Sequence, residues 1–130
     1  MAERVFKRGE IYWVNLPDKG GHELKDRHMG IIISNNRQNQ FSPVIIVLPL
    51  TSLKEGDKVY HFEVETLINS QSGKILVDQI TTIDKAKRIG KLVGKFEEKI
   101  LVKIERAICY VLALSTEALE EELTKRKKGN

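Results

Sequence analysis

Short apolar runs separated by polar turns occupy the first three quarters of the chain. In residues 10–16, Ile11 and Trp13 would face one side while Tyr12 and Val14 face the other, which is the two-residue period of a β-strand. Similar runs bounded by Gly, Pro, Asn or charged residues recur along the chain. They predict strands over 10–16, 29–34, 44–51, 59–65, 74–80 and 89–93. In the run 59–65, this period places Tyr60 and Phe62 in the core.

The hydrophobic period changes after residue 96, where apolar residues recur at helical spacing. The residues that share this face are Ile100, Leu101, Ile104, Ala107, Ile108, Val111 and Leu112. Glu97 and Glu98 lie at the expected start, where the helix dipole favours acidic groups. Residues 115–117 (STE) either cap a second helix that runs to about Lys125 or interrupt a continuous one. The pattern predicts a small, mainly β barrel with a C-terminal helix.

The composition is that of one soluble globular domain spanning residues 1–130, with a flexible tail at about 126–130. Hydrophobic residues make up 41% and charged residues 31% of the chain, and no apolar run has the roughly 18 residues of a membrane helix. The first residues carry no signal-peptide core, so we expect a cytoplasmic protein with no membrane partner. Cys109 is the single cysteine, so the chain forms no internal disulfide.

The net charge of +4 and pI of about 9.2 are compatible with a nucleic acid or an acidic protein as partner. Part of this charge lies in residues 125–128 (KRKK), which also fits a solvated chain end.

Polar residues at the ends of two predicted strands are the candidate chemistry. A glycine-containing loop with Glu23 leads to the basic pair Arg27 and His28, and the strand 44–51 ends on Thr51 and Ser52. No histidine or cysteine pair has metal-ligand spacing, and no phosphate-binding glycine loop occurs, so we expect no cofactor.

These groups suit cleavage of an RNA phosphodiester without a metal, because RNA supplies its own 2′-OH nucleophile. Histidine exchanges protons near neutral pH, arginine binds phosphate through two parallel hydrogen bonds, and a threonine hydroxyl can donate to a phosphate oxygen. The same residue types at strand ends also serve as structural or merely solvated groups, and the residues alone leave both interpretations open.

Six short motifs, in order and over nearly the whole length, resemble the MazF/PemK family of toxin endoribonucleases. They are residues 8–13 (RGEIYW), 21–23 (GHE), 31–34 (IIIS), 41–52 (FSPVIIVLPLTS), 77–85 (VDQITTIDK) and 94–96 (GKF) with the helix that follows. Each motif is weak alone, whereas six in the right order and spacing identify the family.

The resemblance implies an SH3-like β-barrel of the MazF/PemK/CcdB toxin type and a homodimer. It implies metal-independent, sequence-selective cleavage of single-stranded RNA, including mRNA, to 2′,3′-cyclic phosphate and 5′-OH ends, which inhibits growth and translation. A cognate antitoxin of the MazE/PemI kind would hold the protein inactive and would supply any contact with DNA.

The family's site is an arginine at the start of the second strand and a threonine at the end of the third. Thr51 falls on the threonine without a gap, but an ungapped count places His28 on the arginine and Met29 on the proline after it. Three interpretations follow: Arg27 takes the role through a local bulge, His28 acts as acid or base with Arg27 assisting, or activity is reduced or lost. One residue of register decides between the first two.

Five further residues are candidates for RNA binding. Glu23 would orient the basic pair, bind the antitoxin or be solvated, and Gln79 would face the RNA or bond nearby backbone. Asn35 and Arg37 would touch RNA or fill a turn, and Ser52 neighbours the candidate threonine.

Two other functions fit the same fold. One is a non-catalytic inhibitor of a protein such as gyrase, like the CcdB toxins, although residues 127–130 (KKGN) differ from the terminal Trp-Gly-Ile associated with those toxins. The other is an RNA- or protein-binding module without chemistry. Trp13 would stack a base in such a module, although a tryptophan in a first strand more often packs in the core.

Overall fold

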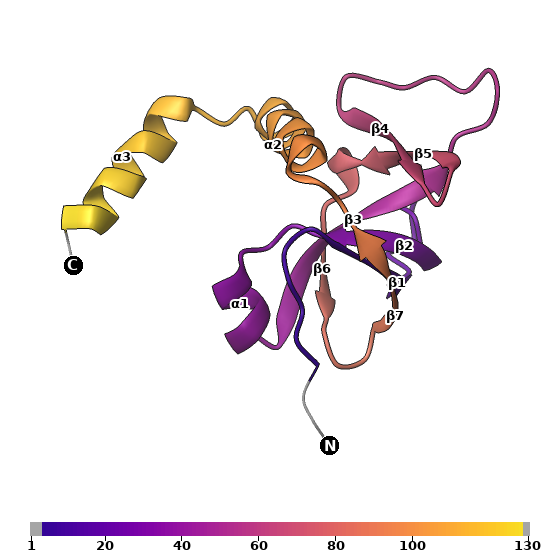
Figure 1. Cartoon of the computed structure of the whole chain (residues 1–130), viewed down its shortest axis with the longest axis horizontal. Helices are drawn as coiled ribbons and strands as arrows, with labels where there is room; N and C mark the ends of the chain where they lie inside the picture. The colour runs from indigo at the N-terminus through magenta and orange to yellow at the C-terminus, as the bar shows by residue number, and fades with distance from the viewer. Residues whose placement is uncertain (1–3, 129–130) are drawn as a thin grey trace.

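The structure is a computed structural model and describes residues 4–128. Seven strands and three α-helices follow one another in this range (Figure 1). The elements are β1 (Glu10–Leu16), β2 (Asp26–Ile32), α1 (Asn36–Phe41), β3 (Val44–Ser52), β4 (Glu63–Ile68), β5 (Gln71–Leu76), the 3₁₀ turn η1 (Val77–Gln79), β6 (Thr81–Asp84), β7 (Ile89–Lys95), α2 (Glu98–Leu112) and α3 (Thr116–Lys128).

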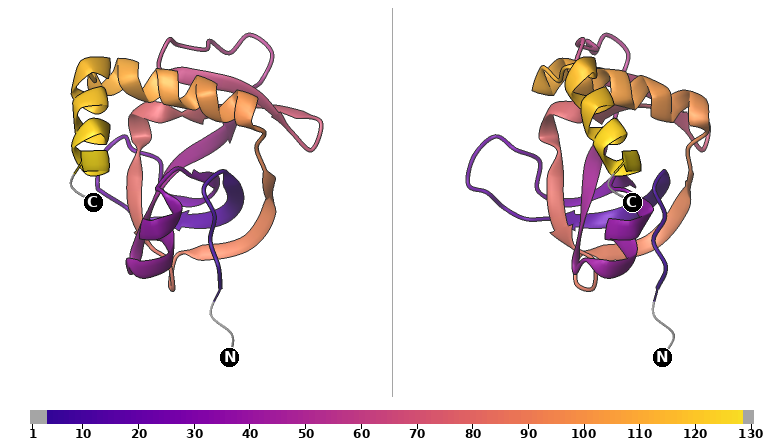
Figure 2. Two further views of the ribbon diagram at one scale, coloured as in Figure 1. Left: turned by 60° about the vertical axis from the view of Figure 1, so that its left-hand side comes forward. Right: turned by 90° about the vertical axis from the view of Figure 1, so that its left-hand side faces the viewer.

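The strands form one antiparallel sheet in the order β4-β5-β3-β2-β1-β7. The long strand β3 serves two neighbours on the same side, because its first half pairs with β6 and its last three residues pair with β5. Figure 2 shows the sheet curling around one interior with α2 across one end. The pairing described for residues 4–128 leaves β4 and β7 at the edges, so the barrel is open. This architecture confirms the predicted mainly β, barrel-like fold with a C-terminal helix.

Two buried clusters lie on the two faces of the sheet. Ile31 and Leu48 pack under α2 with Ile104, whereas their neighbours Ile32 and Val47 belong to the second cluster on the other face. Side chains of a strand point alternately to opposite faces, so runs buried on both sides are continuously apolar. Such runs therefore lack the alternation that marks a half-exposed strand.

The polar connection after β2, expected to be a turn, is the short helix α1. Asn35 caps it, since its Oδ1 accepts a hydrogen bond from the Gln38 N–H at 2.8 Å. Asn39 is buried, and its Nδ2 donates to the carbonyl of Ser34 at 2.9 Å. Side-chain bonds to the backbone thus make a helix from a segment that has no apolar stripe.

The predicted strand 59–65 was placed too early, because β4 begins at Glu63. Tyr60 is 51% exposed and Phe62 half-buried, so their prediction as core residues was wrong. The register is set by the hairpin to β5, whose turn residues Asn69 and Ser70 both have positive φ. That geometry is the one that matches the twist of antiparallel strands.

Other boundaries also differ from the predictions, among them the end of β2 at Ile32, the start of β5 at Gln71 and the end of β7 at Lys95. β2 starts at Asp26, three residues before the predicted strand, and the strand expected over 74–80 ends at Leu76 and continues as η1.

The C-terminal segment forms two helices rather than one continuous helix. Ala113 adopts a left-handed conformation with φ 52°, and its N–H donates to the last carbonyls of α2, which ends that helix. α3 then leads away from the barrel (Figure 1). It runs to Lys128, so residues 126–128 of the expected tail are helical, and residues 129–130 lie outside the described residues. No helix within residues 4–128 is long and apolar enough to cross a bilayer.

Candidate active site

A pocket of about 320 Å³ opens where the start of β2 meets the end of β3. It contains all three residues predicted to be catalytic. The pocket is lined by Trp13, Arg27, His28, Met29, Leu50, Thr51, Ser52, Ile68, Gln71, Ser72 and Gly73. We call it the cleavage pocket.

Strand pairing explains why residues distant in the sequence meet there. Met29 of β2 pairs with Leu50 of β3, and the strands run antiparallel. Continued along both strands, this register sets His28 opposite Thr51 and Arg27 opposite Ser52. The pairing thus brings the basic pair and the two hydroxyl residues to one edge of the sheet.

Arg27 stacks on Trp13, for which a position in the core was the favoured prediction. The guanidinium carbon lies 4.4 Å from the centroid of the indole ring. The two residues are diagonal neighbours, because Trp13 pairs with Met29 and Asn15 pairs with Arg27. A guanidinium over an indole face is attracted by the ring quadrupole. Trp13 is only half-buried and forms part of the pocket wall.

The register of β2 bears on which basic residue faces Thr51. β1 and β2 pair without a shift from Leu16 with Asp26 to Ile11 with Ile31. The stretch of β2 from Asp26 to Ile31 therefore contains no bulge against β1. The pairing of β2 with β3 ends at Met29 with Leu50, and both Arg27 and His28 line the pocket with Thr51.

The β4–β5 hairpin closes the pocket on the side of β5, a contribution that the sequence did not reveal. Gly73 pairs with Ser52, and a Cβ built on Gly73 would lie 3.1 Å from the carbonyl oxygen of Thr51. Glycine thus permits the close approach of β5 to the end of β3. The sequence placed Gly73 in the turn before a predicted strand, where a glycine gives no signal of such an approach.

Gln79 and Glu23 lie outside the residues that line the cleavage pocket. The Oε1 atom of Gln79 accepts a hydrogen bond from the N–H of Leu24 at 2.7 Å, which ties the β1–β2 loop to η1. This bond supports the structural interpretation of Gln79. Glu23 is exposed in the loop beside it.

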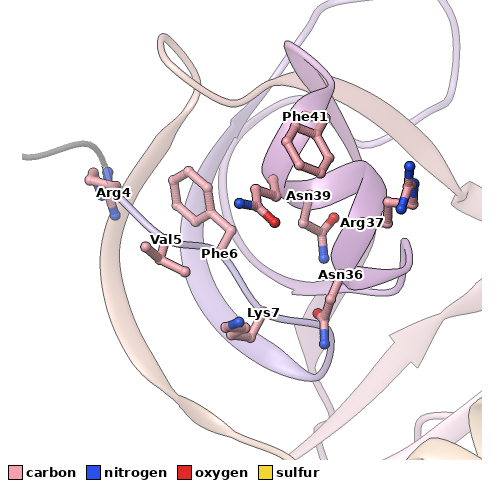
Figure 3. A pocket seen from close by; sticks show the side chains of 9 residues that line it. Arg4, Val5, Phe6, Lys7, Asn36, Arg37, Asn39 and Phe41 are labelled. Atoms are coloured by element: carbon pink, nitrogen blue, oxygen red, sulfur yellow. The ribbon is translucent and has the colours of Figure 1, made fainter.

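Asn35 and Arg37 lie beyond the opposite end of β2 from Arg27, so the structure does not bring them to Thr51. Asn35 is used as the cap of α1. The guanidinium of Arg37 lies 5.8 Å from the centroid of the Phe41 ring. Arg37 lines a separate hollow of about 450 Å³ between α1 and the N-terminal segment with Phe6 (Figure 3). Within residues 4–128, no cluster of His, Cys, Asp and Glu could hold a metal ion.

Solved structures share this fold. MazF from Deinococcus radiodurans (Form-I) superposes with a TM-score of 0.75 at 23% identity, covering 86% of this chain and 100% of that one. An endoribonuclease in complex with its cognate antitoxin from Mycobacterial species superposes with a TM-score of 0.67 at 23% identity, covering 84% of this chain and 96% of that one. The architecture is therefore that of the MazF-type toxins.

Sequence comparison gives the family. Residues 7–112 match the model described as PemK-like, MazF-like toxin of type II toxin-antitoxin system, so the chain belongs to this family, as predicted. Endoribonuclease EndoA of Bacillus subtilis is 29% identical over 113 residues, which cover 85% of this chain and 97% of EndoA. Endoribonuclease MazF of Staphylococcus epidermidis is 28% identical over 114 residues, which cover 85% and 94% of the two chains.

Proposed function

We propose that the protein is an endoribonuclease toxin that cleaves single-stranded RNA at the cleavage pocket without a metal. The observation that carries the proposal is the meeting of His28, Arg27 and Thr51 at one pocket through the β2–β3 pairing. The similarity to proteins named as endoribonucleases supports the same enzyme class.

The chemistry assigns a separate task to each group. His28 accepts the proton of the 2′-OH, whose oxygen attacks the adjacent phosphorus and forms the P–O2′ bond. The guanidinium of Arg27 and the hydroxyl of Thr51 donate to the non-bridging oxygens, where negative charge develops. The P–O5′ bond then breaks, the 5′ oxygen takes a proton from solvent, and His28 releases its proton to solvent. The products are a 2′,3′-cyclic phosphate and a 5′-OH.

We propose a homodimer that inhibits growth through selective cleavage of mRNA, and an antitoxin that inactivates it. Solved structures of MazE–MazF from Deinococcus radiodurans support an antitoxin partner. An antitoxin segment rich in acidic residues would complement the basic chain by charge, and contact with DNA would come through the antitoxin.

The test is cleavage of a long single-stranded RNA in EDTA by Arg27→Ala, His28→Ala and Thr51→Ala. Each variant has a matched control at an exposed residue of the same type, namely Arg106→Ala, His61→Ala and Thr82→Ala. We expect each site variant to lose about 100-fold or more in rate, since each removes a group that acts in the transition state. The controls keep the wild-type rate, and the products carry 2′,3′-cyclic phosphate.

A binding module without chemistry is the second candidate. It is favoured by the ungapped count, which places His28 where the family has its arginine. RNA that binds the wild type but stays intact under these conditions would support this module and refute the nuclease. Cleavage that is equally fast in all three site variants would place the reaction elsewhere on the molecule.

A further inference from the structure

A second hollow, of about 510 Å³, lies beside the cleavage pocket and shares two residues with it. Trp13 and Arg27 line both hollows, so their stacked side chains form the wall between them. Beyond this wall the lining includes Asn15, Lys87, Arg88 and Gly90.

The two hollows follow consecutive strands of the sheet. In the strand order β3-β2-β1-β7, each strand contributes to one row. β3 contributes Thr51, β2 contributes Arg27 and β1 contributes Trp13. The row ends with the residues before and at the start of β7. Neighbouring strands lie about 4.8 Å apart, so the row extends roughly 14 Å. That length exceeds what a single nucleotide in the cleavage pocket would occupy.

The chemistry of the second hollow suits a nucleotide. The Arg27–Trp13 stack presents flat groups on which a base can stack. Gly90 lets β7 lie close to β1 beside this stack, because a Cβ at this position would lie 3.3 Å from the Trp13 carbonyl oxygen and 3.6 Å from the Trp13 Cβ. The exposed Lys87 and the half-buried Arg88 add positive charge, against one carboxylate, that of Asp26.

Hydrogen bonds to the backbone hold Lys87 and Arg88, the basic residues at the rim of the second hollow. Asp84 Oδ1 accepts the N–H of Ala86 at 2.8 Å and that of Lys87 at 2.9 Å, which fixes the β6–β7 turn. The Arg88 guanidinium donates to the Asn15 carbonyl at 3.2 Å, and the Asn15 N–H donates to the Arg88 carbonyl at 2.8 Å. The β6–β7 turn therefore holds Lys87 in a defined position at the rim of the second hollow.

We propose that this second hollow is a nucleotide subsite of the RNA track, in which Lys87 binds a phosphate next to the scissile one and a base stacks on the Arg27–Trp13 pair. The inference rests on the proposed ribonuclease function and extends it from the cleaved bond to the neighbouring nucleotide.

Binding without cleavage tests the subsite separately from the nuclease. Trp13 is the single tryptophan of the chain, so its fluorescence reports directly on base stacking at this wall. The probes are mixed-sequence 2′-O-methyl RNA oligonucleotides of about two, four and eight nucleotides, whose blocked 2′ oxygen prevents cleavage. Wild type, Lys87→Ala and Lys95→Ala are titrated at several salt concentrations. Lys95 is an exposed lysine at the other end of β7 and provides the matched control.

We expect RNA to quench Trp13 fluorescence in the wild type, with tighter binding as the oligonucleotide lengthens. Lys87→Ala should weaken binding of the longer probes about three- to tenfold and lower the slope of log K against log salt by about 0.7, the value for one phosphate contact in a single strand. Lys95→Ala should match the wild type.

Three outcomes would overturn the subsite. One is equal binding by Lys87→Ala and Lys95→Ala. Another is active RNA cleavage with no change in Trp13 fluorescence, which would leave the nuclease standing but move the RNA track away from this wall. The third is Lys87-dependent binding of a poly-glutamate peptide without any quenching by RNA, which would assign the hollow to an acidic protein.

Discussion

At the scale of single residues, neighbours in the sequence have different environments. Arg27 and His28 follow each other in β2, yet Arg27 stacks on Trp13 while no such ring contact within residues 4–128 holds His28, which lines the pocket with Thr51. In the proposed reaction, this arrangement separates the cation that binds phosphate from the group that moves a proton. Substitution of either residue should therefore affect cleavage for a different chemical reason.

Tyr12 shows how burial changes the ionisation of a core residue. Its hydroxyl donates to Glu10 Oε1 at 3.1 Å, and its ring meets Phe6 edge-on with 5.2 Å between centroids. Burial, followed by the nearby charge and hydrogen bond of Glu10, raises the pKa of Tyr12 to about 12, and Arg4 acts in the opposite direction.

This shift predicts a loss of stability in alkali. A pKa higher in the folded than in the unfolded state stabilises the fold fully below about pH 10, and this contribution disappears as pH rises through about 12. We expect the free energy of unfolding to fall by about 2 to 3 kcal/mol more in the wild type than in Tyr12→Phe over this range. Denaturant unfolding at stepped pH measures the difference. An identical fall in both proteins would contradict the assignment.

At the scale of elements, α1 depends on its cap rather than on an apolar face. Asn35→Ala removes the acceptor of the Gln38 N–H and should lower the free energy of unfolding by about 1 kcal/mol. Gln40→Ala, at an exposed position of the same helix, should change it much less. Urea unfolding measures both. RNA cleavage should persist in Asn35→Ala, because α1 lies beyond the far end of β2, and loss of cleavage in a folded variant would return Asn35 to the RNA site.

Because β5 lies so close to the end of β3, we expect RNA cleavage to be sensitive to a methyl group added at Gly73. Gly73→Ala would place a Cβ 3.1 Å from the Thr51 carbonyl oxygen and should displace the strand end that carries Thr51. We expect cleavage to slow by about tenfold, because small displacements of reacting groups are costly. Gly94→Ala meets no atom within 4 Å and provides the control. Equal rates in the two variants would show that the strand end tolerates the shift.

At the scale of the whole molecule, the stable unit is the barrel with α2. Ile104 of α2 is completely buried in the cluster beneath the helix, whereas the described side chains of α3 are exposed. The family match ends at residue 112, where α2 also ends.

A chain that stops after Leu114 should therefore fold like the full chain. It keeps the bond from the Leu114 N–H to the Cys109 carbonyl and loses only exposed surface. We expect the free energy of unfolding to change by less than about 0.5 kcal/mol. Ile104→Ala, by contrast, should cost about 3 kcal/mol through the cavity it leaves. Thermal and urea unfolding compare the three proteins, and a large loss on truncation would show that α3 stabilises the fold.

Much of the local structure follows directly from the amino-acid sequence. Hydrophobic periodicity located most strands and α2, because the side-chain period follows from the local backbone geometry. It also marked Arg27, His28, Thr51 and Ser52 as polar groups at strand ends, and the ordered motifs identified the family.

The way in which these groups combine depends on the three-dimensional fold. Strand register joins residues far apart in the chain and depends on hairpin geometry and packing, which local patterns do not encode. It brought His28 and Thr51 to one pocket, placed Trp13 under Arg27 and placed Gly73 against the end of β3. It also placed Asn35 and Arg37 beyond the other end of β2, which excludes them from the cleavage pocket.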